Sequence, residues 1–311
     1  MKCVRYDRYG GPEVLRLDDI EPHEPGRGQI RVRVMAASVN PMDWKIRSGQ
    51  LKMMTGSRFP RGLGHDFAGV VEAVGPDVKA FEVGDEVFGA TGLKEASTFA
   101  ESLVTDEKWT FIKPPALSFE VAAALPIVSM TAWTGLVDKA KLRAGQSVFV
   151  TGCLGGVGRA AVQLAALRGA VVAGSCSAAG REEALALGAS EVFDYRALDL
   201  ASLRRRFDVV FDTAGFLSLG QCDAVLKPGG VALHIVPTPA KMIRSLVSSR
   251  HHTVFGTATP EGIAAIVDAA VAGKLVPKIG RIVPLSEAIA AITELETTGS
   301  PKGKLVIVPA R

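Results

Sequence analysis

Hydrophobic and polar residues follow two different patterns along this chain, and the pattern changes after Pro114-Pro115. Before that point, residues 30–39 alternate Ile, Val and Met with Arg and Ala, which is the period of a half-buried strand. Residues 67–74 form another short apolar run, closed by Gly75-Pro76. Because Pro and Gly recur about every ten residues, this part of the chain predicts a compact, barrel-like β domain.

After the change, apolar runs alternate with helical patterns. Residues 120–139 have a helical composition, residues 147–151 predict a buried strand, and residues 157–168 predict a helix. This alternation is typical of βαβ units and a parallel sheet. The further elements that we expect are strands at 170–173, 207–211 and 231–236 and a helix at 181–187.

The tail returns to an extended pattern. We expect residues 282–284 to be extended, residues 286–297 to form a helix with Ser286 as N-cap, and residues 304–308 to form a last strand. The tail should rejoin the first domain. The expected organisation is a β-rich domain from 1–122 plus 259–311, with an α/β domain, 123–258, inserted in it.

Composition excludes several classes of protein. The chain has 311 residues, 48% of them hydrophobic, and a formal charge of +4, which is ordinary globular composition. No aromatic residues interleave with the basic stretches at 204–206 and 241–252, so nucleic acid is not an expected partner. No apolar run reaches about eighteen residues and no signal peptide is visible, so we expect no membrane partner. The four scattered cysteines favour a reducing, cytoplasmic setting.

The strongest motif lies at 151–158, with the sequence TGCLGGVG, between an expected strand and an expected helix. This is the context of a dinucleotide-binding loop. Gly155 lets the backbone approach a pyrophosphate, and Gly158 lets the helix pack closely, while free N–H groups and the helix dipole hold the anion. The alternative is an ordinary tight turn. The loop residues that we expect to bind a cofactor are Gly152, Gly155, Gly156, Val157 and Gly158.

The residues after the second strand of this domain bear on the choice of cofactor. Enzymes that use NADH usually carry Asp or Glu there for the ribose 2′-hydroxyl. Here residues 174–177 are Gly-Ser-Cys-Ser, and Arg181 follows. Ser175 and Ser177 offer hydroxyl groups, and Arg181 offers a guanidinium that can bind a phosphate, although each also fits a turn or a helix start. The pattern predicts NADPH.

Together these features resemble the medium-chain dehydrogenase/reductase superfamily, and within it the zinc-free quinone oxidoreductase-like, or ζ-crystallin-like, branch. The resemblance covers essentially the whole chain. It is carried by residues 9–15 (YGGPEVL), 38–49 (SVNPMDWKIRSG), 64–75 (GHDFAGVVEAVG), 83–87 (VGDEV), 125–132, the glycine loop and 302–305 (KGKL).

The resemblance implies an α/β fold with a GroES-like catalytic domain and a Rossmann domain, a doubly wound parallel sheet. It also implies a homodimer and hydride transfer from NADPH to a small quinone or α,β-unsaturated carbonyl. Zinc-dependent relatives hold their catalytic metal with Cys, His and Cys. Here His65 occupies the His position, Asn40 the first Cys position, and 125–128 contain no cysteine, so we expect no metal.

Five further site residues follow from the resemblance. Asn40 and Asp43 match positions that line the substrate pocket, although both are also good helix-capping residues. Lys45 stands near the same pocket and offers an ammonium for a developing oxyanion, or is a solvated surface lysine. Thr131 matches a threonine near the nicotinamide, and Tyr195 matches a tyrosine on the 2′-phosphate side; a helix position and a strand-end aromatic are their alternatives.

Two other functions stay open at this point. An enoyl-thioester reductase would normally carry a tyrosine proton donor near the Asn40 loop, but the tyrosines of this chain are Tyr6, Tyr9 and Tyr195. A non-catalytic nucleotide-binding protein is the second alternative, because crystallins and vesicle-associated relatives of the family are of that kind. The sequence does not name the physiological substrate.

Overall fold

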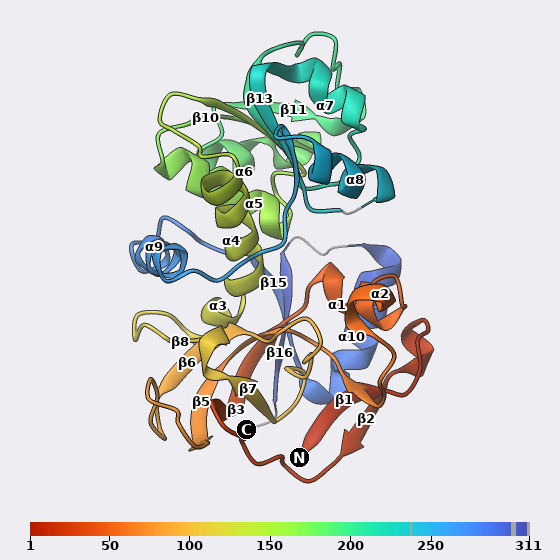
Figure 1. Cartoon of the computed structure of the whole chain (residues 1–311), viewed down its shortest axis with the longest axis vertical. Helices are drawn as coiled ribbons and strands as arrows, with labels where there is room; N and C mark the ends of the chain where they lie inside the picture. The colour runs from red at the N-terminus through yellow and green to blue at the C-terminus, as the bar shows by residue number, and fades with distance from the viewer. Residues whose placement is uncertain (237, 300–302, 310–311) are drawn as a thin grey trace. The chain divides into compact units, whose positions relative to one another are not determined.

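The chain forms two compact units in a computed structural model that describes residues 1–236, 238–299 and 303–309. One unit contains Met1–Pro126 and Pro277–Arg311, and the other contains Ile127–Val276. The second unit is therefore inserted into the first along the chain, as the colours of Figure 1 show. Lys302, part of a family motif, lies outside the described residues.

The first unit is β-rich. Its larger sheet has the strand order β15-β16-β3-β5-β6-β8, with β7 also paired to β3, and a smaller sheet has the order β2-β1-β4. The strands of the larger sheet are β3 (Gln29–Ser38), β5 (Asp66–Val74), β6 (Glu86–Ala90), β7 (Ser102–Asp106), β8 (Thr110–Ile112), β15 (Ile279–Pro284) and β16 (Lys304–Val308). Those of the smaller sheet are β1 (Lys2–Tyr6), β2 (Arg16–Asp19) and β4 (Arg61–Gly62).

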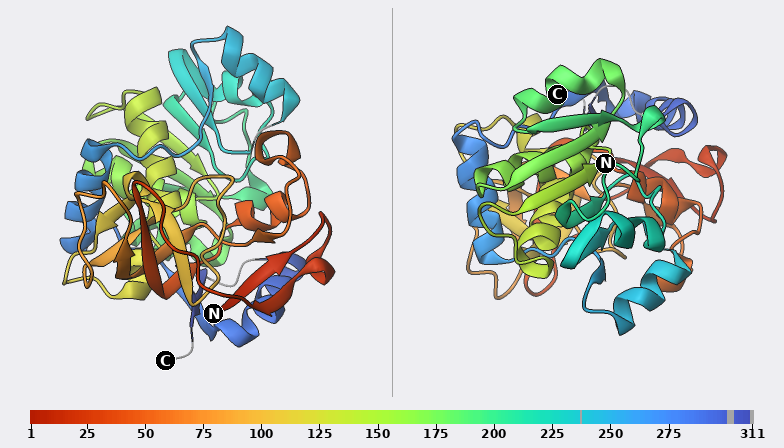
Figure 2. Two further views of the ribbon diagram at one scale, coloured as in Figure 1. Left: turned by 60° about the horizontal axis from the view of Figure 1, so that its bottom comes forward. Right: turned by 90° about the horizontal axis from the view of Figure 1, so that it is seen from above.

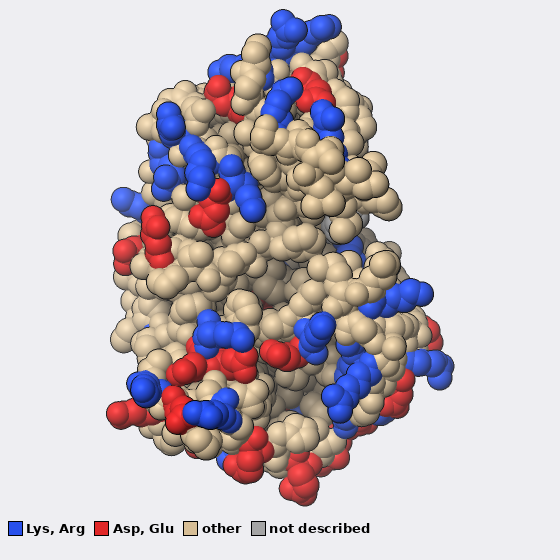
Figure 3. Space-filling model, in the orientation of Figure 1, with Lys and Arg blue, Asp and Glu red and all other residues tan. Residues whose placement is uncertain are grey.

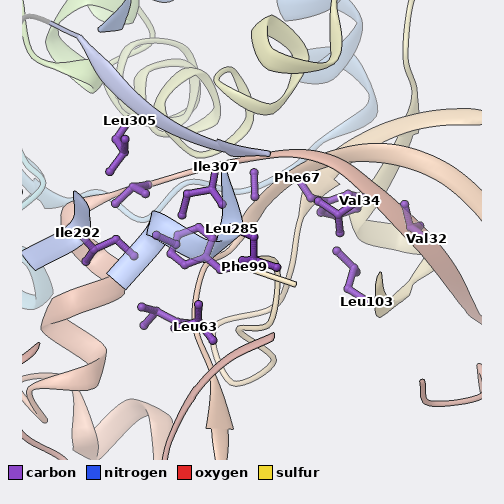
Figure 4. Close-up of a cluster of buried hydrophobic side chains, with 14 of the residues drawn as sticks. Val32, Val34, Leu63, Phe67, Phe99, Leu103, Leu285, Ile292, Leu305 and Ile307 are labelled. Atoms are coloured by element: carbon purple, nitrogen blue, oxygen red, sulfur yellow. The ribbon is translucent and has the colours of Figure 1, made fainter. Parts of the chain in front are cut away.

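The core of this unit fills the space between the larger sheet and its helices. Figure 4 shows Val32 and Val34 of β3 near Phe67 of β5 and Leu103 of β7, all buried. The tail contributes Leu305 and Ile307 of β16 and Ile292 of a helix, so it completes the core of the first unit. The helical segments are η1 (Pro12–Val14), α1 (Pro41–Arg47), α2 (Lys52–Thr55), η2 (Glu107–Trp109), α3 (Phe119–Ala123), η6 (Leu285–Glu287) and α10 (Ala288–Thr298).

The second unit is a parallel sheet with the order β11-β10-β9-β12-β13-β14, a doubly wound arrangement whose strands lie side by side in the right-hand view of Figure 2. The strands are β9 (Ser147–Thr151), β10 (Val171–Cys176), β11 (Glu191–Asp194), β12 (Phe207–Asp212), β13 (Leu226–His234) and β14 (His251–Thr253). The helical segments are α4 (Pro126–Trp133), η3 (Thr134–Lys139), α5 (Gly156–Leu167), η4 (Ala178–Gly180), α6 (Arg181–Ala186), η5 (Tyr195–Ala197), α7 (Leu219–Val225), α8 (Pro239–Val247) and α9 (Pro260–Val271). The expected α/β fold is confirmed.

The structure differs from the sequence expectations at two boundaries. Residues 259–276 belong to the inserted unit instead of the first, because the Gln163 amide on α5 donates to the Val276 carbonyl and accepts from the Val276 N–H. Ser286 lies inside η6 and is not an N-cap, since the buried Leu285 draws residues 285–287 into a 3-10 turn before α10 begins. Among the described residues, no helix is long and apolar enough to cross a bilayer.

Candidate active site

In the first unit, the strand β3 delivers the chain to a short helix at Asn40. Asn40 is the N-cap of α1, and its backbone N–H donates to Asp43 Oδ2 at 2.7 Å. Asp43 is the third residue of that helix and is fully buried. Helix capping therefore describes the local structure of both residues. It does not involve the second carboxylate oxygen of Asp43, Oδ1.

The second carboxylate oxygen of Asp43 contacts a histidine. Asp43 Oδ1 lies 2.8 Å from Nδ1 of His65, which stands just before β5 and is 1% exposed. Since an ionised carboxylate can only accept, this contact places a hydrogen on Nδ1 and fixes the ring. The other ring nitrogen, Nε2, is buried and has no hydrogen-bond partner among the described residues. The His65 imidazole is thus oriented by Asp43 through Nδ1, while Nε2 lacks a hydrogen-bond partner among the described residues.

A buried ion pair holds the other side of Asn40. The Asn40 amide donates to Asp66 Oδ2 at 2.8 Å, and Lys304 Nζ lies 2.9 Å from Asn40 Oδ1 and 3.2 Å from Asp66 Oδ2. Ser38 Oγ donates to the same Asp66 oxygen at 3.0 Å. Because the tail strand β16 starts at Lys304, the C-terminal segment helps to set the position of a pocket residue near the other end of the chain.

Lys45 and Arg47 on α1 have different environments. Lys45 is half-buried, and no partner for its ammonium is recorded among the described residues. Arg47 is fully buried and donates through Nη2 to both carboxylate oxygens of Glu296 at 2.8 Å, so its role is structural. A contact between Lys45 and a substrate stays a prediction. In the part of the chain that the structure describes, no group of three His, Cys, Asp or Glu residues could hold a metal ion.

In the second unit, the glycine loop leads from β9 into α5. Gly152 has φ +59°, a left-handed conformation that favours glycine, and a Cβ on Gly158 would lie 2.1 Å from the Gly152 carbonyl oxygen. Gly155 is the N-cap of α5 in extended conformation, and no side chain caps the helix. Gly156 and Val157 are the next two residues of the helix. The uncapped start of this twelve-residue helix and the side-chain-free loop fit a dinucleotide pyrophosphate.

The end of β10 carries the residues expected to select the cofactor. Ser175 is buried, and its Oγ has no hydrogen-bond partner among the described residues. Ser177 follows the strand as the N-cap of η4. The exposed Arg181 donates through Nη1 to the Val192 carbonyl at 2.6 Å, which fixes its side chain at the start of α6.

The neighbouring strand β11 and the turn η5 that follows it add one expected and two unexpected residues at this edge. Tyr195 is 47% exposed, and the Arg196 guanidinium lies over its ring at 4.8 Å from the centroid. Asp194 pairs in register with Cys176, but its Oδ1 accepts from the Arg196 N–H. The carboxylate of Asp194 therefore lies on the strand next to residues 174–177, which contain no carboxylate, and it already accepts a hydrogen bond.

Thr131 lies on α4, and its hydroxyl donates to the Ile127 carbonyl at 2.7 Å. Its proton is therefore used within the helix, and only its lone pairs could serve a ligand. A Cβ on Gly256 would lie 2.9 Å from Thr131 Oγ1, so the segment after β14 passes close to this residue. The structure thus leaves the role of Thr131 toward a cofactor as a prediction.

A second buried polar network lies at the ends of β9, β12 and β13, and sequence reasoning missed it. Asp212 accepts from Thr151 Oγ1 at 2.9 Å and from Lys241 Nζ at 2.8 Å, and all three residues are buried. His234 Nδ1 lies 4.0 Å from Asp212, and its Nε2 lies 3.2 Å from His251 Nδ1. Burial, the Lys241 charge and the neighbouring histidines lower the pKa of His234 to about 4.

The signal for the missed residues was present but weak. Lys304 and Asp66 each open a largely apolar strand, and Asp212 closes one. A charge at the end of a buried strand is a candidate for ion pairing, but the sequence does not show which charges meet.

The chain matches two family models. Residues 26–115 match the alcohol dehydrogenase GroES-like domain, and residues 187–307 match the zinc-binding dehydrogenase domain. The quinone oxidoreductase QR1 of Triphysaria versicolor is 31% identical over 99% of this chain and 98% of its own length. An NADPH-dependent alkenal/one oxidoreductase of Arabidopsis thaliana is 38% identical over 77% of this chain and 64% of its own length.

Solved structures show the same likeness. The quinone oxidoreductase of Coxiella burnetii is 32% identical with a TM-score of 0.88, covering 100% of this chain and 99% of that one. A mycobacterial protein solved in complex with NADPH is 26% identical with a TM-score of 0.85, covering 99% of this chain and 100% of that one. The family supports an oxidoreductase with a nicotinamide cofactor. On its sequence and its fold, the chain belongs to the quinone oxidoreductase-like, or ζ-crystallin-like, branch of the medium-chain dehydrogenase/reductase superfamily.

Proposed function

We propose that the protein is an NADPH-dependent reductase of quinones or α,β-unsaturated carbonyl compounds and works without zinc. The observation that carries this proposal is the end of β10, where residues 174–177 hold serines and no carboxylate beside a glycine loop. The names of the quinone and alkenal/one oxidoreductases among its relatives support the substrate class.

The residues of the second unit fit the cofactor. The first N–H groups of α5 would bind the pyrophosphate, while Ser177, Arg181 and Tyr195 would contact the 2′-phosphate side. The unpartnered buried Oγ of Ser175 would gain a hydrogen bond there. When bound, NADPH supplies the hydride, and the protein supplies position and polarity.

The residues of the first unit would act on the substrate oxygen. Negative charge develops on that oxygen when a conjugated carbonyl or a quinone is reduced, and a nearby donor lowers the barrier. The Lys45 ammonium is half-buried without a recorded partner among the described residues, so it can donate. Asn40 has less to offer, since its amide is already bonded to Asp66 at 2.8 Å. Lys45 is therefore our candidate to hold the charge or give the proton.

The ligand positions of the zinc-dependent relatives argue for this substrate class. Asn40 occupies the first Cys position, and His65, at the His position, is already bonded to Asp43. Without a Lewis acid, an isolated ketone is poorly polarised, whereas conjugation spreads the charge onto an oxygen that neutral or cationic donors can stabilise. Saturated ketones and alcohols should accordingly react poorly.

A panel of acceptors tests the proposal. NADPH oxidation is followed by absorbance with a quinone, an enone, an enal, an enoyl thioester and a saturated ketone, and then repeated with NADH. We expect turnover with the first three acceptors and NADPH. Lys45→Ala should lower kcat by about ten-fold or more, as loss of an oxyanion donor does, while the exposed Lys52→Ala should not change it.

Three results would refute the proposal. Efficient oxidation of a simple alcohol would indicate Lewis-acid chemistry, and preference for the enoyl thioester would indicate the alternative reductase. Tight NADPH binding with no acceptor reduced would indicate a nucleotide-binding protein without catalysis.

A further inference from the structure

The carboxyl ends of β9 and β12 lie where the strand order of the second unit reverses. The chain builds outward from β9 through β10 to β11, and then resumes at β12, on the other side of β9, toward β14. In an open parallel sheet, a dinucleotide binds across the carboxyl ends of the strands at such a point. A side chain that joins the ends of β9 and β12 is therefore close to the place that we propose for the cofactor.

Thr151 and Asp212 join these two strand ends. They lie opposite each other in the register of β9 and β12, and both are fully buried. The Thr151 hydroxyl donates to Asp212 Oδ1 at 2.9 Å and accepts from the Ala214 N–H at 3.2 Å. Asp212 Oδ1 also accepts from the Gly215 N–H at 3.0 Å. The two side chains thus bond two backbone groups of the loop after β12, while Thr151 leads directly into the glycine loop.

The two loops that follow these strands are in contact. The Thr213 hydroxyl donates to the Thr151 carbonyl at 2.5 Å. A Cβ on Gly152, the first glycine of the glycine loop, would lie 3.1 Å from the Ala214 Cβ. Because a shift of the loop after β12 would press against Gly152, the separation of the two loops depends on the bonds that Thr151 and Asp212 make.

A second group of a hydroxyl, an Asp and a Lys lies at the opposite end of the same strands. Ser147 Oγ donates to Asp208 Oδ2 at 2.7 Å, and Lys227 Nζ lies 2.8 Å from that oxygen. Asp208 and Lys227 are partly exposed, and Figure 3 shows charged side chains of the second unit at its surface, whereas Asp212 and Lys241 are buried. Taking two charges out of water has a desolvation cost that their attraction often does not offset. Stability alone therefore does not account for the buried group.

We propose that Thr151 and Asp212 are positioning residues for the nicotinamide half of the cofactor. This inference rests on the proposed function, in which the 2′-phosphate side lies at β10 and the nicotinamide half therefore lies toward β12. The two residues would hold the glycine loop and residues 213–215 at the separation that a bound dinucleotide needs, while Lys241 Nζ, 2.8 Å from Asp212 Oδ2, balances the charge. Because these bonds do not involve the 2′-phosphate side, their loss should weaken NADPH and NADH alike, unlike the loss of a phosphate contact.

Removal of the Thr151 hydroxyl tests the proposal, because Thr151→Val keeps the shape of the side chain and loses both of its hydroxyl bonds. Fluorescence titration should show NADPH and NADH each bound about ten-fold more weakly, since the buried carboxylate loses a donor and the loops loosen. Thr151→Ser keeps the hydroxyl and should bind both cofactors within about two-fold of the wild type. In the cofactor-free protein, hydrogen exchange at residues 152–158 and 213–215 should be faster in Thr151→Val than in the wild type.

Ser147→Ala is the matched control, since it removes the hydroxyl from the group at the other end of β9. It should leave both affinities and the exchange of the two loops unchanged. The inference is overturned if Thr151→Val binds both cofactors as tightly as the wild type, weakens NADPH alone, or has the same loop exchange as Ser147→Ala. It is also overturned if Thr151→Ser binds as weakly as Thr151→Val. A wild type that binds neither cofactor would refute the proposed function and this inference with it, whereas normal wild-type binding with unchanged variants refutes the inference alone.

Discussion

Single residues in the candidate site make more than one polar contact. Asp43 bonds the Asn40 backbone with one carboxylate oxygen and His65 with the other, at 2.7 and 2.8 Å. Its helix-capping role therefore leaves one carboxylate oxygen for His65, and a role of Asp43 toward a substrate stays a prediction. Arg181 donates to the Val192 carbonyl through Nη1 and has further guanidinium donors, which we propose bind the phosphate.

The proposed phosphate contact of Arg181 gives a prediction at this scale. Removing a charge-assisted contact costs about 1.5–3 kcal/mol, so Arg181→Ala should weaken NADPH binding roughly ten-fold or more and leave NADH binding nearly unchanged. Titration of both cofactors by fluorescence measures this difference.

An exposed arginine of the same unit serves as the control. Arg204→Ala should change the affinity for neither cofactor. Equal losses for NADPH and NADH in Arg181→Ala would mean that Arg181 does not bind the phosphate, and tighter NADH binding by the wild type would rule out the cofactor preference itself.

At the scale of elements, the glycine loop joins a strand and a helix with almost no space between them. A methyl group on Gly158 would lie 2.1 Å from the Gly152 carbonyl oxygen, and this oxygen belongs to the backbone and cannot rotate away. A methyl group on Gly155 would meet the same oxygen only at 3.3 Å, from an ordinary extended conformation. Substitutions at the two glycines should therefore distinguish an effect on folding from an effect on cofactor binding.

We predict different results for the two substitutions. Gly158→Ala should lower the free energy of unfolding by about 1–3 kcal/mol through overpacking and should also weaken NADPH. Gly155→Ala should stay within about 1 kcal/mol of the wild type yet weaken NADPH, because its methyl group occupies the proposed pyrophosphate space. Urea unfolding and cofactor titration distinguish them.

Gly220 on α7 provides the comparison, since a Cβ there has no atom within 4 Å. Gly220→Ala should raise the free energy of unfolding by at most about 1 kcal/mol, because alanine suits a helix better than glycine, and should leave the affinity unchanged. If Gly158→Ala is as stable as the wild type and binds NADPH equally well, the close approach of loop and helix has no consequence.

At the scale of the whole molecule, the buried network around Asp212 links stability to pH. His234 has a pKa of about 4 in the folded chain against 6.5 for a free side chain, because burial and the Lys241 charge outweigh the opposing effect of Asp212, while His251 and His252 lower the pKa further by smaller effects. Between about pH 4 and pH 6.5, His234 binds a proton in the unfolded chain but not in the folded chain. Stabilisation is therefore complete above about pH 6.5 and is lost as the pH falls toward 4.

We predict that this loss amounts to about 3 kcal/mol, at 1.36 kcal/mol for each pKa unit of difference. Urea unfolding at about pH 7, 6 and 5 should show a falling free energy for the wild type and a shallower fall for His234→Gln. His252, whose pKa is also lowered by burial, should leave a small residual slope in the variant. Identical slopes in the two proteins would show that His234 titrates normally.

The sequence by itself determined the β-rich pattern of the first unit, the alternating strands and helices of the inserted parallel-sheet unit, and the glycine loop. These features depend on neighbours along the chain: the strands at 30–39 and 147–151 follow from local alternation or apolar runs, and the loop follows from glycine spacing. The same reasoning failed at Ser286 and at residues 259–276, where the packing of Leu285 and the contact of Gln163 with Val276 set the boundary.

Only the tertiary structure decided which charges meet. Lys304 reaches Asp66 across 238 positions, and Lys241 reaches Asp212 across 29. No local pattern specifies such pairs, because a buried charge selects its partner by proximity in the folded core, where leaving it unpaired would cost several kcal/mol. The direction of α8 is the same kind of result: its amphipathic pattern is visible in the sequence, but the ion pair of Lys241 with Asp212 turns its apolar face outward.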